Sequence, residues 1–248
     1  MLRFKIIITI MFIVGTLSSC SSIKRLNDTP IGLINNVSYK DSSFDNPNAS
    51  NGFLVEYENR AYGVTAKHIL IMAKTDKMKF VDFEGELKQW RMHPKNDSKN
   101  YVILDKLLST NKKDSLTWSY LDTNWDTFND WLVFSVKENK TKYKPLKFRK
   151  EPLKKDENVY VIGWSYKDSV GPQRVYTYKF NEIEGNYYNL KQIEGPKSLG
   201  GLSGSPVVDK KGRVVALVSS GWEDEKTKEV FIQATSMKNT IEFISQLE

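Results

Sequence analysis

The stretch Gly200-Gly201-Leu202-Ser203-Gly204-Ser205-Pro206-Val207-Val208 is the most distinctive part of this sequence. A second strand-like run, Val214 to Ser219, follows it after the turn at Lys211-Gly212. Glycines around a serine let backbone N–H groups turn inward, as a nucleophile requires. A serine hydroxyl attacks a carbonyl only if a base removes its proton and donors stabilise the resulting oxyanion. In isolation the stretch also fits an ordinary Gly-Ser turn, so Ser203 needs partners elsewhere.

The candidate base follows by elimination, because the chain has 2 histidines. His68 lies directly after a strand-like stretch, in the segment Gly63 to Leu70. His93 lies in the polar segment Arg91 to Lys95, which is typical of a structural or exposed histidine. A lone histidine is most often structural, so the case for His68 depends on its pairing with Ser203.

Two motifs connect this sequence to a family. Thr65-Ala66-Lys67-His68 resembles the T-A-x-H of trypsin-like serine proteases, and Gly201 to Pro206 resembles their G-x-S-G-[GS]-P, in the same order along the chain. The form with serine before proline is closer to the bacterial glutamyl-endopeptidase and exfoliative-toxin branch. The resemblance covers residues 50–248. It implies a chymotrypsin-like all-β fold of two antiparallel six-stranded β-barrels, and hydrolysis of protein or peptide substrates without a metal or cofactor.

The family places an orienting aspartate between the histidine and the serine, at the start of a strand. Asn129-Asp130-Trp131-Leu132-Val133-Phe134-Ser135-Val136 matches this pattern, which makes Asp130 the expected third member of the triad. It would hold the histidine tautomer and stabilise the imidazolium. Asp130 also fits a turn residue at a strand edge, because Leu132 stands where the family usually has a small residue. Asp122 and Asp126 are nearby competitors.

The resemblance further implies an oxyanion hole made by the backbone N–H groups of Gly201 and Ser203. Trypsin has an aspartate at the position of Leu202, where it pairs with a newly cut N-terminus. Leucine cannot form that ion pair, so the sequence argues against activation by that route.

The family also binds substrate along a strand edge, here Ser219, Ser220 and Gly221. The wall of the first substrate pocket would include Lys197 and Ser198, in the segment before the nucleophile. Lys197 would favour an acidic side chain if it pointed inward, although a loop lysine is usually solvated. The glutamyl-specific branch uses a histidine in this pocket, and this chain has none after His93.

The N-terminus has the pattern of a secretory signal. Arg3 and Lys5 precede the apolar run Ile6 to Leu17, which is shorter than the roughly 20 residues that cross a bilayer as a helix. Leu17-Ser18-Ser19-Cys20 resembles the bacterial lipobox, which implies an exported lipoprotein held to a membrane by a lipid on Cys20, on the periplasmic or cell-surface side. The alternative is a plain signal peptide with a cysteine near its end.

Composition narrows the function classes further. The chain has 248 residues, 40% of them hydrophobic and 27% charged, as in an ordinary globular protein. Its single cysteine, Cys20, excludes an intramolecular disulfide and Cys/His zinc sites. The formal net charge is +7, but no long basic run is present, which argues against nucleic-acid binding and leaves a modest attraction to anionic surfaces.

The sequence divides into four expected parts. Residues 1–19 form the signal peptide, 20–50 a lipid-anchored flexible tether with one possible strand, 51–145 the N-terminal barrel, and 146–248 the C-terminal barrel with a terminal helix. Strand signals lie at Ile31 to Val37, Gly52 to Tyr57, Met78 to Phe83, Trp131 to Val136, Val159 to Trp164 and Val175 to Phe180, and helix signals at Ala66 to Ala73 and Ser236 to Leu247.

The leading functional hypothesis is therefore a serine endopeptidase with the triad His68, Asp130 and Ser203. A second hypothesis is a catalytically inactive lipoprotein of the trypsin fold that acts as a binding or assembly module. A third is a polyanion-binding lipoprotein that uses its basic excess.

Overall fold

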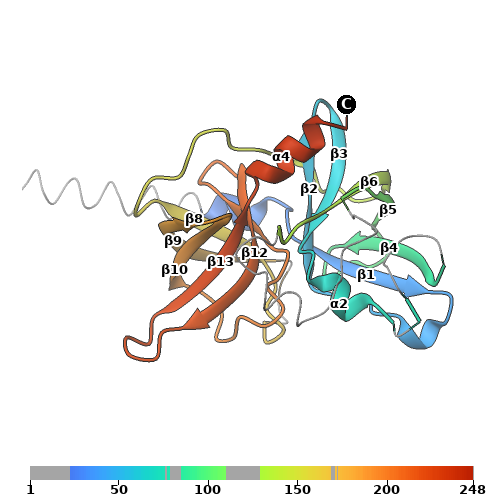
Figure 1. Cartoon of the computed structure of the whole chain (residues 1–248), viewed down its shortest axis with the longest axis horizontal. Coiled ribbons are helices and arrows are strands. Elements are labelled where there is room, and N and C mark those ends of the chain that lie inside the picture. The colour runs from blue at the N-terminus through green and yellow to red at the C-terminus, as the bar shows by residue number, and fades with distance from the viewer. Residues whose placement is uncertain are drawn as a thin grey trace, which may run out of the picture.

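Two six-stranded antiparallel β-barrels lie side by side in the computed structural model of the protein (Figure 1). The structure describes residues 23–247, apart from residues 76, 79–84, 110–128, 169–170 and 172. The signal peptide, Cys20 and the competing aspartates Asp122 and Asp126 lie outside the described residues, as does most of the strand expected at Met78 to Phe83. The all-β class and the barrel architecture that the sequence predicts are confirmed.

The first barrel closes through a pairing between its first two strands. The strands follow one another around the ring in the order β1-β4-β5-β6-β3-β2, and β1 then pairs with β2 at Leu33 with Gly52 and Ile34 with Asn51. The short strand β7 adds to β2 in parallel. The strands are β1 (Leu33–Tyr39), β2 (Asn51–Tyr57), β3 (Arg60–Thr65), β4 (Leu87–His93), β5 (Val102–Leu107), β6 (Leu132–Asn139) and β7 (Leu146–Lys147).

The second barrel is closed in the order β10-β13-β12-β11-β8-β9. Its strands are β8 (Asn158–Gly163), β9 (Arg174–Glu184), β10 (Tyr187–Glu194), β11 (Pro206–Val208), β12 (Val214–Glu223) and β13 (Val230–Ser236). The predicted strand signals at 52–57, 131–136, 159–164 and 175–180 correspond to β2, β6, β8 and β9. Valine, isoleucine and aromatic residues dominate these runs because they pack well on a pleated, half-buried surface.

Apolar packing joins the two barrels. The larger core cluster contains Phe53 and Phe134 of the first barrel together with Ile162 and Leu217 of the second. The change from one barrel to the other falls between β7, which pairs with β2, and Phe148, which forms a bridge with Val214 of the second barrel. The expected division near residue 145 is therefore close to the observed one.

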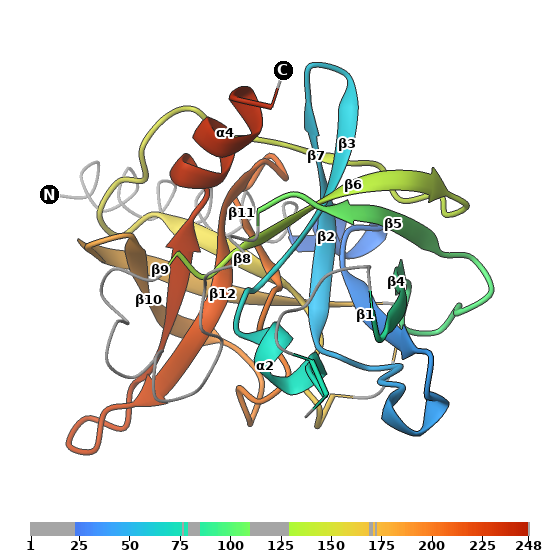
Figure 2. The same ribbon diagram turned by 45° about the vertical axis from the view of Figure 1, so that its right-hand side comes forward.

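Helical segments accompany the barrels: residues 23–28 are helical, and a 3-10 turn η1 (Ser42–Phe44), α2 (Ile69–Ala73) and α4 (Lys238–Ser245) follow along the chain. The helix α4 follows β13 and also contacts β2 of the first barrel. Figure 2 shows it between the end of β13 and the hairpin of β2 and β3. Its Ile244 is fully buried, and the ring of Phe243 lies 5.3 Å from that of Trp131. The predicted C-terminal helix is confirmed with shorter bounds, because Ser236 ends β13 and Met237 takes the N-cap position.

The expectation of a flexible tether over residues 20–50 is wrong from residue 23 onward. Leu26 is buried, and β1 belongs to the first barrel. The side chain of Gln173 accepts hydrogen bonds from the N–H groups of Ile31 and Gly32 at 3.0 and 3.1 Å, and donates to the carbonyls of Leu26 and Thr29 at 2.7 Å. These bonds satisfy the backbone of a polar segment that local composition alone would leave solvated.

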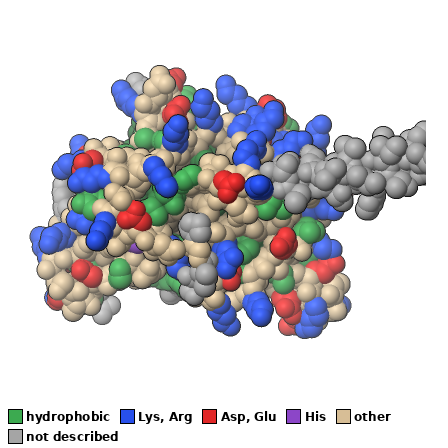
Figure 3. All heavy atoms as spheres, turned by 180° about the vertical axis from the view of Figure 1, so that it is seen from behind, with side chains coloured by type: hydrophobic (Ala, Val, Ile, Leu, Met, Phe, Trp, Pro, Cys, Tyr) green, Lys and Arg blue, Asp and Glu red, His purple; other side chains and the backbone are tan. Residues whose placement is uncertain are grey.

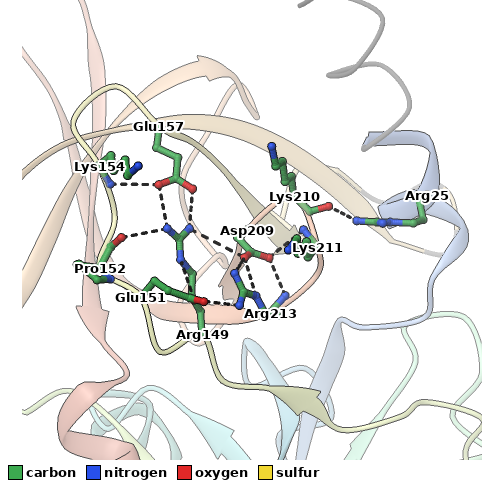
Figure 4. Close-up of polar contacts among 10 residues, drawn as sticks. All are labelled: Arg25, Arg149, Glu151, Pro152, Lys154, Glu157, Asp209, Lys210, Lys211 and Arg213. Carbon is green, nitrogen blue, oxygen red and sulfur yellow. Dashed lines mark hydrogen bonds and ion pairs between the residues drawn. The ribbon is translucent and has the colours of Figure 1, made fainter.

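An ion-pair network fixes the connection between the barrels (Figure 4). Arg149, after β7, binds both carboxylate oxygens of Glu157, just before β8. Asp209, in the turn between β11 and β12, forms an ion pair with the guanidinium of Arg213 at 2.8 Å. The guanidinium of Arg25 donates to the carbonyl of Lys210, so the N-terminal segment is attached to the same turn.

Within these described ranges, no helix is both long and apolar enough to cross a membrane.

Candidate active site

His68 lies where β3 gives way to α2, on the side of the first barrel that faces the second. Thr65 ends β3, and Ile69 and Leu70, which begin α2, are fully buried. This burial anchors the segment on both sides of the histidine. The His68 side chain is itself only 7% exposed, so its ring has a fixed position.

Asp130 directly precedes β6 and is completely buried. Its Oδ2 atom lies 2.7 Å from Nδ1 of His68, and its Oδ1 atom accepts the backbone N–H of His68 at 2.8 Å. The hydroxyl of Ser219, on β12, donates a further hydrogen bond to Oδ2. The carboxylate therefore fixes both the position of the His68 backbone and the orientation of the ring.

Opposing effects set the protonation of this pair. Burial disfavours the charged form of His68, but the Asp130 charge and hydrogen bond outweigh it and raise the pKa of His68 above its ordinary value. Burial likewise opposes ionisation of Asp130, but the His68 charge and the bonds from His68 and Ser219 lower the pKa of Asp130. Asp130 thus remains a carboxylate while His68 can gain or lose a proton.

Ser203 stands in the loop before β11, with its hydroxyl facing His68 from the second barrel. The distance from Ser203 Oγ to His68 Nε2 is 2.8 Å, within hydrogen-bond reach. The neighbouring Gly204 has a φ of +77°, and a Cβ there would lie 2.2 Å from the carbonyl oxygen of Asn51. Only glycine fits at this point, because any side chain would clash with the backbone of Asn51 in the tight turn after the serine.

The structure thus brings together His68, Asp130 and Ser203, the three residues that the sequence motifs single out. The alternative aspartates cannot be compared because they lie outside the described residues. His93, by contrast, is buried near the end of β4, where its Nδ1 atom contacts the carbonyl of Pro94 at 2.7 Å. Its position agrees with a structural role.

The backbone N–H groups of Gly201 and Ser203 are free to receive an anion. Neither donates a hydrogen bond to any residue in the described part of the chain. The carbonyl of Gly200 accepts the N–H of Tyr166 at 2.9 Å. In a trans peptide the N–H points opposite to the C=O, so this contact directs the N–H of Gly201 away from Tyr166.

Leu202 lies between these two donors and is 1% exposed, packed in the core of the second barrel. Its burial agrees with the expectation that this position holds no ion pair with a chain terminus. Leu202 therefore fixes the loop that carries Ser203 by apolar packing, at the position where trypsin has a charged aspartate.

Ser219 reaches Asp130 because β12 is irregular at this residue. Val218 pairs with Ala234 of β13, and Ser220 pairs with Gln233, which leaves Ser219 as an extra residue in the ladder. Such a bulge re-aims the side chain of the extra residue.

The other edge of β12 is open beside the nucleophile. Pairing with β11 extends only as far as Leu217, and within the described residues no strand pairs with Ser219, Ser220 or Gly221 on that side. This geometry is the one required to add an extended peptide to the sheet.

A pocket of about 210 Å³ lies beside Ser203. Its walls are formed by residues 199–203, residues 218–221 and Ile232. Lys197 is exposed and, like Ser198, is not among the residues that form these walls. The wall begins only at Leu199, and the described residues that line the pocket are apolar residues, glycines and serines, none of them charged. The proposed basis for an acidic preference is therefore missing from the described pocket.

Two residues at the start of β2 contact the nucleophile loop and were missed by sequence reasoning. The Ser50 hydroxyl donates to the carbonyls of Gly201 and Ser203 at 3.0 and 2.7 Å. The backbone N–H of Asn51 donates to the Ser203 carbonyl at 3.0 Å.

The Asn51 side chain adds a second layer of contacts. Its amide donates to the carbonyls of Trp164 and Gly201, and its Oδ1 atom accepts the N–H of Trp164 at 3.0 Å. Asn51 of the first barrel therefore holds two segments of the second barrel beside the free N–H groups, one that contains Gly201 and one that contains Trp164. The one available signal was Asn51-Gly52 at the start of a strand, which is common at turns.

Comparisons with known proteins agree with this geometry. Residues 50–217 match the trypsin-like peptidase domain family, and the chain belongs to that family. No curated protein gives a significant match.

Solved structures share the fold at low sequence identity. Kallikrein-related peptidase 10 is 11% identical, with a TM-score of 0.59 over 89% of this chain and 96% of its own. The active form of the Rv3671c protease from M. tuberculosis is 13% identical, with a TM-score of 0.55 over 90% of this chain and 82% of its own. Its inactive form has a TM-score of 0.52, 13% identity and coverage of 93% and 94%. At these identities the likeness concerns the fold alone.

Proposed function

We propose that the protein is a serine endopeptidase that cleaves peptide bonds through an acyl-enzyme on Ser203. The observation that carries this proposal is the continuous hydrogen-bonded chain from Ser203 Oγ to His68 Nε2 at 2.8 Å and from His68 Nδ1 to Asp130 Oδ2 at 2.7 Å. Nucleophile, base and orienting group are thus within contact distance of one another, as acyl transfer requires.

In the first half of the reaction, His68 takes the Ser203 proton as the hydroxyl attacks the carbonyl carbon. Asp130, fully buried, stabilises the imidazolium that forms. The oxyanion is stabilised by the N–H groups of Gly201 and Ser203. His68 then gives its proton to the leaving amine, and the C–N bond breaks.

In the second half, a water molecule repeats the attack on the ester carbon. His68 accepts the proton of the water and returns it to Ser203 as the acid product leaves. Each proton is accounted for within the triad, so the reaction needs no group beyond those of the chain and water.

Substrate would bind as an extended strand along Ser219, Ser220 and Gly221, where β12 has an open edge. The side chain before the scissile bond would enter the pocket between Leu199 and Ile232. Ser205-Pro206 supports a place in the bacterial glutamyl-endopeptidase and exfoliative-toxin branch, but none of the described residues that line the pocket is a cation that would favour an acidic side chain.

We also propose that the protein is an exported lipoprotein held to a membrane through Cys20. The support is the lipobox-like Leu17-Ser18-Ser19-Cys20 after a short apolar run, together with the absence of any other cysteine from the sequence. Metabolic palmitate labelling with membrane fractionation tests this location. A wild-type protein that stays unlabelled and soluble would contradict it.

Cleavage-site profiling of a peptide library tests the activity, with the chain from residue 20 carrying Cys20→Ser and a Ser203→Ala partner as control. The proposal expects cleavage by the first protein and none by the second. If neither protein cleaves and both are folded, the fold serves instead as an inactive binding or assembly module.

A further inference from the structure

Three segments far apart in sequence form one basic surface. The N-terminal residues 28–31, the connector 142–147 and the turn 211–213 line a common hollow of about 470 Å³. Exposed cations stand on these segments and beside them: Lys24, Arg25, Lys142, Lys144, Lys147, Lys210 and Lys211, here called the basic surface. Figure 4 shows the adjacency directly, with Arg25 against the carbonyl of Lys210.

The charge of this basic surface is not neutralised internally. Among the described residues that line the hollow, Asp28 is the one acid. The lysines at 142, 144, 147 and 211 form no ion pair with any described residue. Figure 3, which views the molecule from behind, shows many Lys and Arg side chains on that face, with Asp and Glu side chains interspersed among them. Unpaired cations held close together are attracted to an anionic partner.

The start of the folded chain lies at the same place. Ile23, the first described residue, packs against the core, and Leu26 is buried, so the chain is docked from Ile23 onward. Cys20 precedes it by three residues, which can span at most about 11 Å even when fully extended. A lipid on Cys20 would therefore hold this surface close to the bilayer, without a long spacer between them.

We propose that the basic surface binds the anionic headgroups of the membrane that carries the lipid on Cys20. The inference rests on the proposed lipid anchor for its biological setting, but the surface and its charge stand independently of that anchor. A bilayer fits better than a free polyanion because the cations lie on and beside the segment 24–31, which leads back along the chain to Cys20. Clustered basic residues beside a lipid anchor supply the second attachment that stable membrane binding needs.

This mode of attachment leaves the candidate active site accessible. The turn at residues 210–213 lies at one end of β12, and Ser220 lies six residues beyond Val214 toward the other end. At about 3.3 Å per residue, the open edge of β12 at Ser220 is roughly 20 Å from the turn at residues 210–213. The membrane would thus contact the end of the sheet remote from the site of cleavage, which orients the catalytic domain rather than letting it swing on a tether.

Vesicle co-sedimentation tests the proposal with the chain from residue 20 carrying Cys20→Ser, so that no lipid contributes. We expect at least about tenfold tighter binding to vesicles with about 30% phosphatidylglycerol than to pure phosphatidylcholine, and release of the protein by salt. Lys142→Gln/Lys144→Gln/Lys211→Gln should weaken binding to the anionic vesicles by about tenfold or more. The matched control Lys88→Gln/Lys106→Gln/Lys226→Gln removes the same charge from exposed lysines outside the surface and should change binding less than about twofold.

Three results would overturn the proposal: no preference for phosphatidylglycerol, equal weakening by both triple variants, or retention on heparin without vesicle binding. The last result would indicate a site for soluble polyanions. Peptide hydrolysis by the same preparations is scored separately. Failure to cleave peptides would count against the protease and leave the vesicle result intact, and failure to bind vesicles would leave the protease proposal intact.

Discussion

Ser219 of the second barrel donates a hydrogen bond to Asp130 of the first, on the same carboxylate oxygen that contacts His68. The acid that orients the histidine is therefore held from both barrels. Asn129, its neighbour in sequence, is also held from the second half of the chain, because its Oδ1 atom accepts the side-chain amides of Asn186 and Asn239 at 3.1 and 3.0 Å.

Replacing Asp130 by asparagine should lower kcat about 10⁴-fold, because the amide stabilises the wrong histidine tautomer and cannot compensate an imidazolium. Ser219→Ala removes only one of the bonds to the carboxylate and should cost far less. Steady-state kinetics on a peptide substrate, with circular dichroism to confirm folding, distinguishes the two. A fully active Asp130→Asn protein would require another acid, with Asp122 and Asp126 as the next candidates.

The pH dependence should follow His68. The base must be neutral to accept the Ser203 proton, so activity is lost as the pH falls below the pKa of His68. Asp130 raises that pKa above the ordinary 6.5, which places the midpoint of the acid limb of kcat/KM above 6.5. In Asp130→Asn the burial effect remains without the opposing charge, so the midpoint of the residual activity should move to lower pH. A midpoint below 6 in the wild-type protein would contradict the assigned charge pairing.

Asn51→Ala should lower kcat by about 10- to 100-fold with little change in KM. The substitution leaves the buried N–H and carbonyl of Trp164 without the Asn51 side chain, at about 1–3 kcal/mol, and removes one of the two side-chain donors to the Gly201 carbonyl, which loosens the segments around the two free N–H groups. Asn35→Ala is a matched control, because Asn35 is an equally buried amide that bonds to Asn51 O and Thr65 but not to the nucleophile loop. If both variants lowered kcat in proportion to their loss of stability, Asn51 would be structural only.

The site residues that belong to motifs were predictable because each motif is a short, continuous stretch of sequence. Ser203 and His68 lie in short patterns whose neighbours serve the same function, and Asp130 begins a strand of alternating apolar residues. The contacts of Ser50 and Asn51 were not predictable, since they join residues about 150 positions apart and depend on how two barrels meet. The bulge that aims Ser219 at Asp130 depends equally on the register between β12 and β13.

For the N-terminal segment, the prediction from composition was wrong. Its Ser, Asn and Asp content suggested a solvated tether, but burial of Leu26 and four hydrogen bonds with Gln173, two accepted and two donated by its side chain, hold it on the second barrel. Composition reports the average polarity of a segment, whereas one buried leucine and one distant glutamine decide whether it docks. The position of Lys197 outside the pocket wall could not be read from the sequence either, because sequence gives no direction for a loop side chain.

Leu202→Asp should destabilise the protein by about 3 kcal/mol or more. The position is 1% exposed, so the carboxylate would be buried without a partner. Leu202→Met, which nearly preserves volume, should cost less than about 1.5 kcal/mol. Urea denaturation of both variants gives the comparison. An aspartate variant as stable as the wild type would mean that a cationic group reaches this position after all.

The most direct test of the central claim is labelling with a fluorophosphonate probe, followed by mass spectrometry to locate the label. A working triad should be labelled stoichiometrically at Ser203, whereas His68→Ala should react at least about 10³-fold more slowly because its serine lacks a base. Ser203→Ala should take up no label at this site. A folded wild-type protein that remains unlabelled, or that carries the label on another residue, would contradict the assignment of Ser203 as the nucleophile.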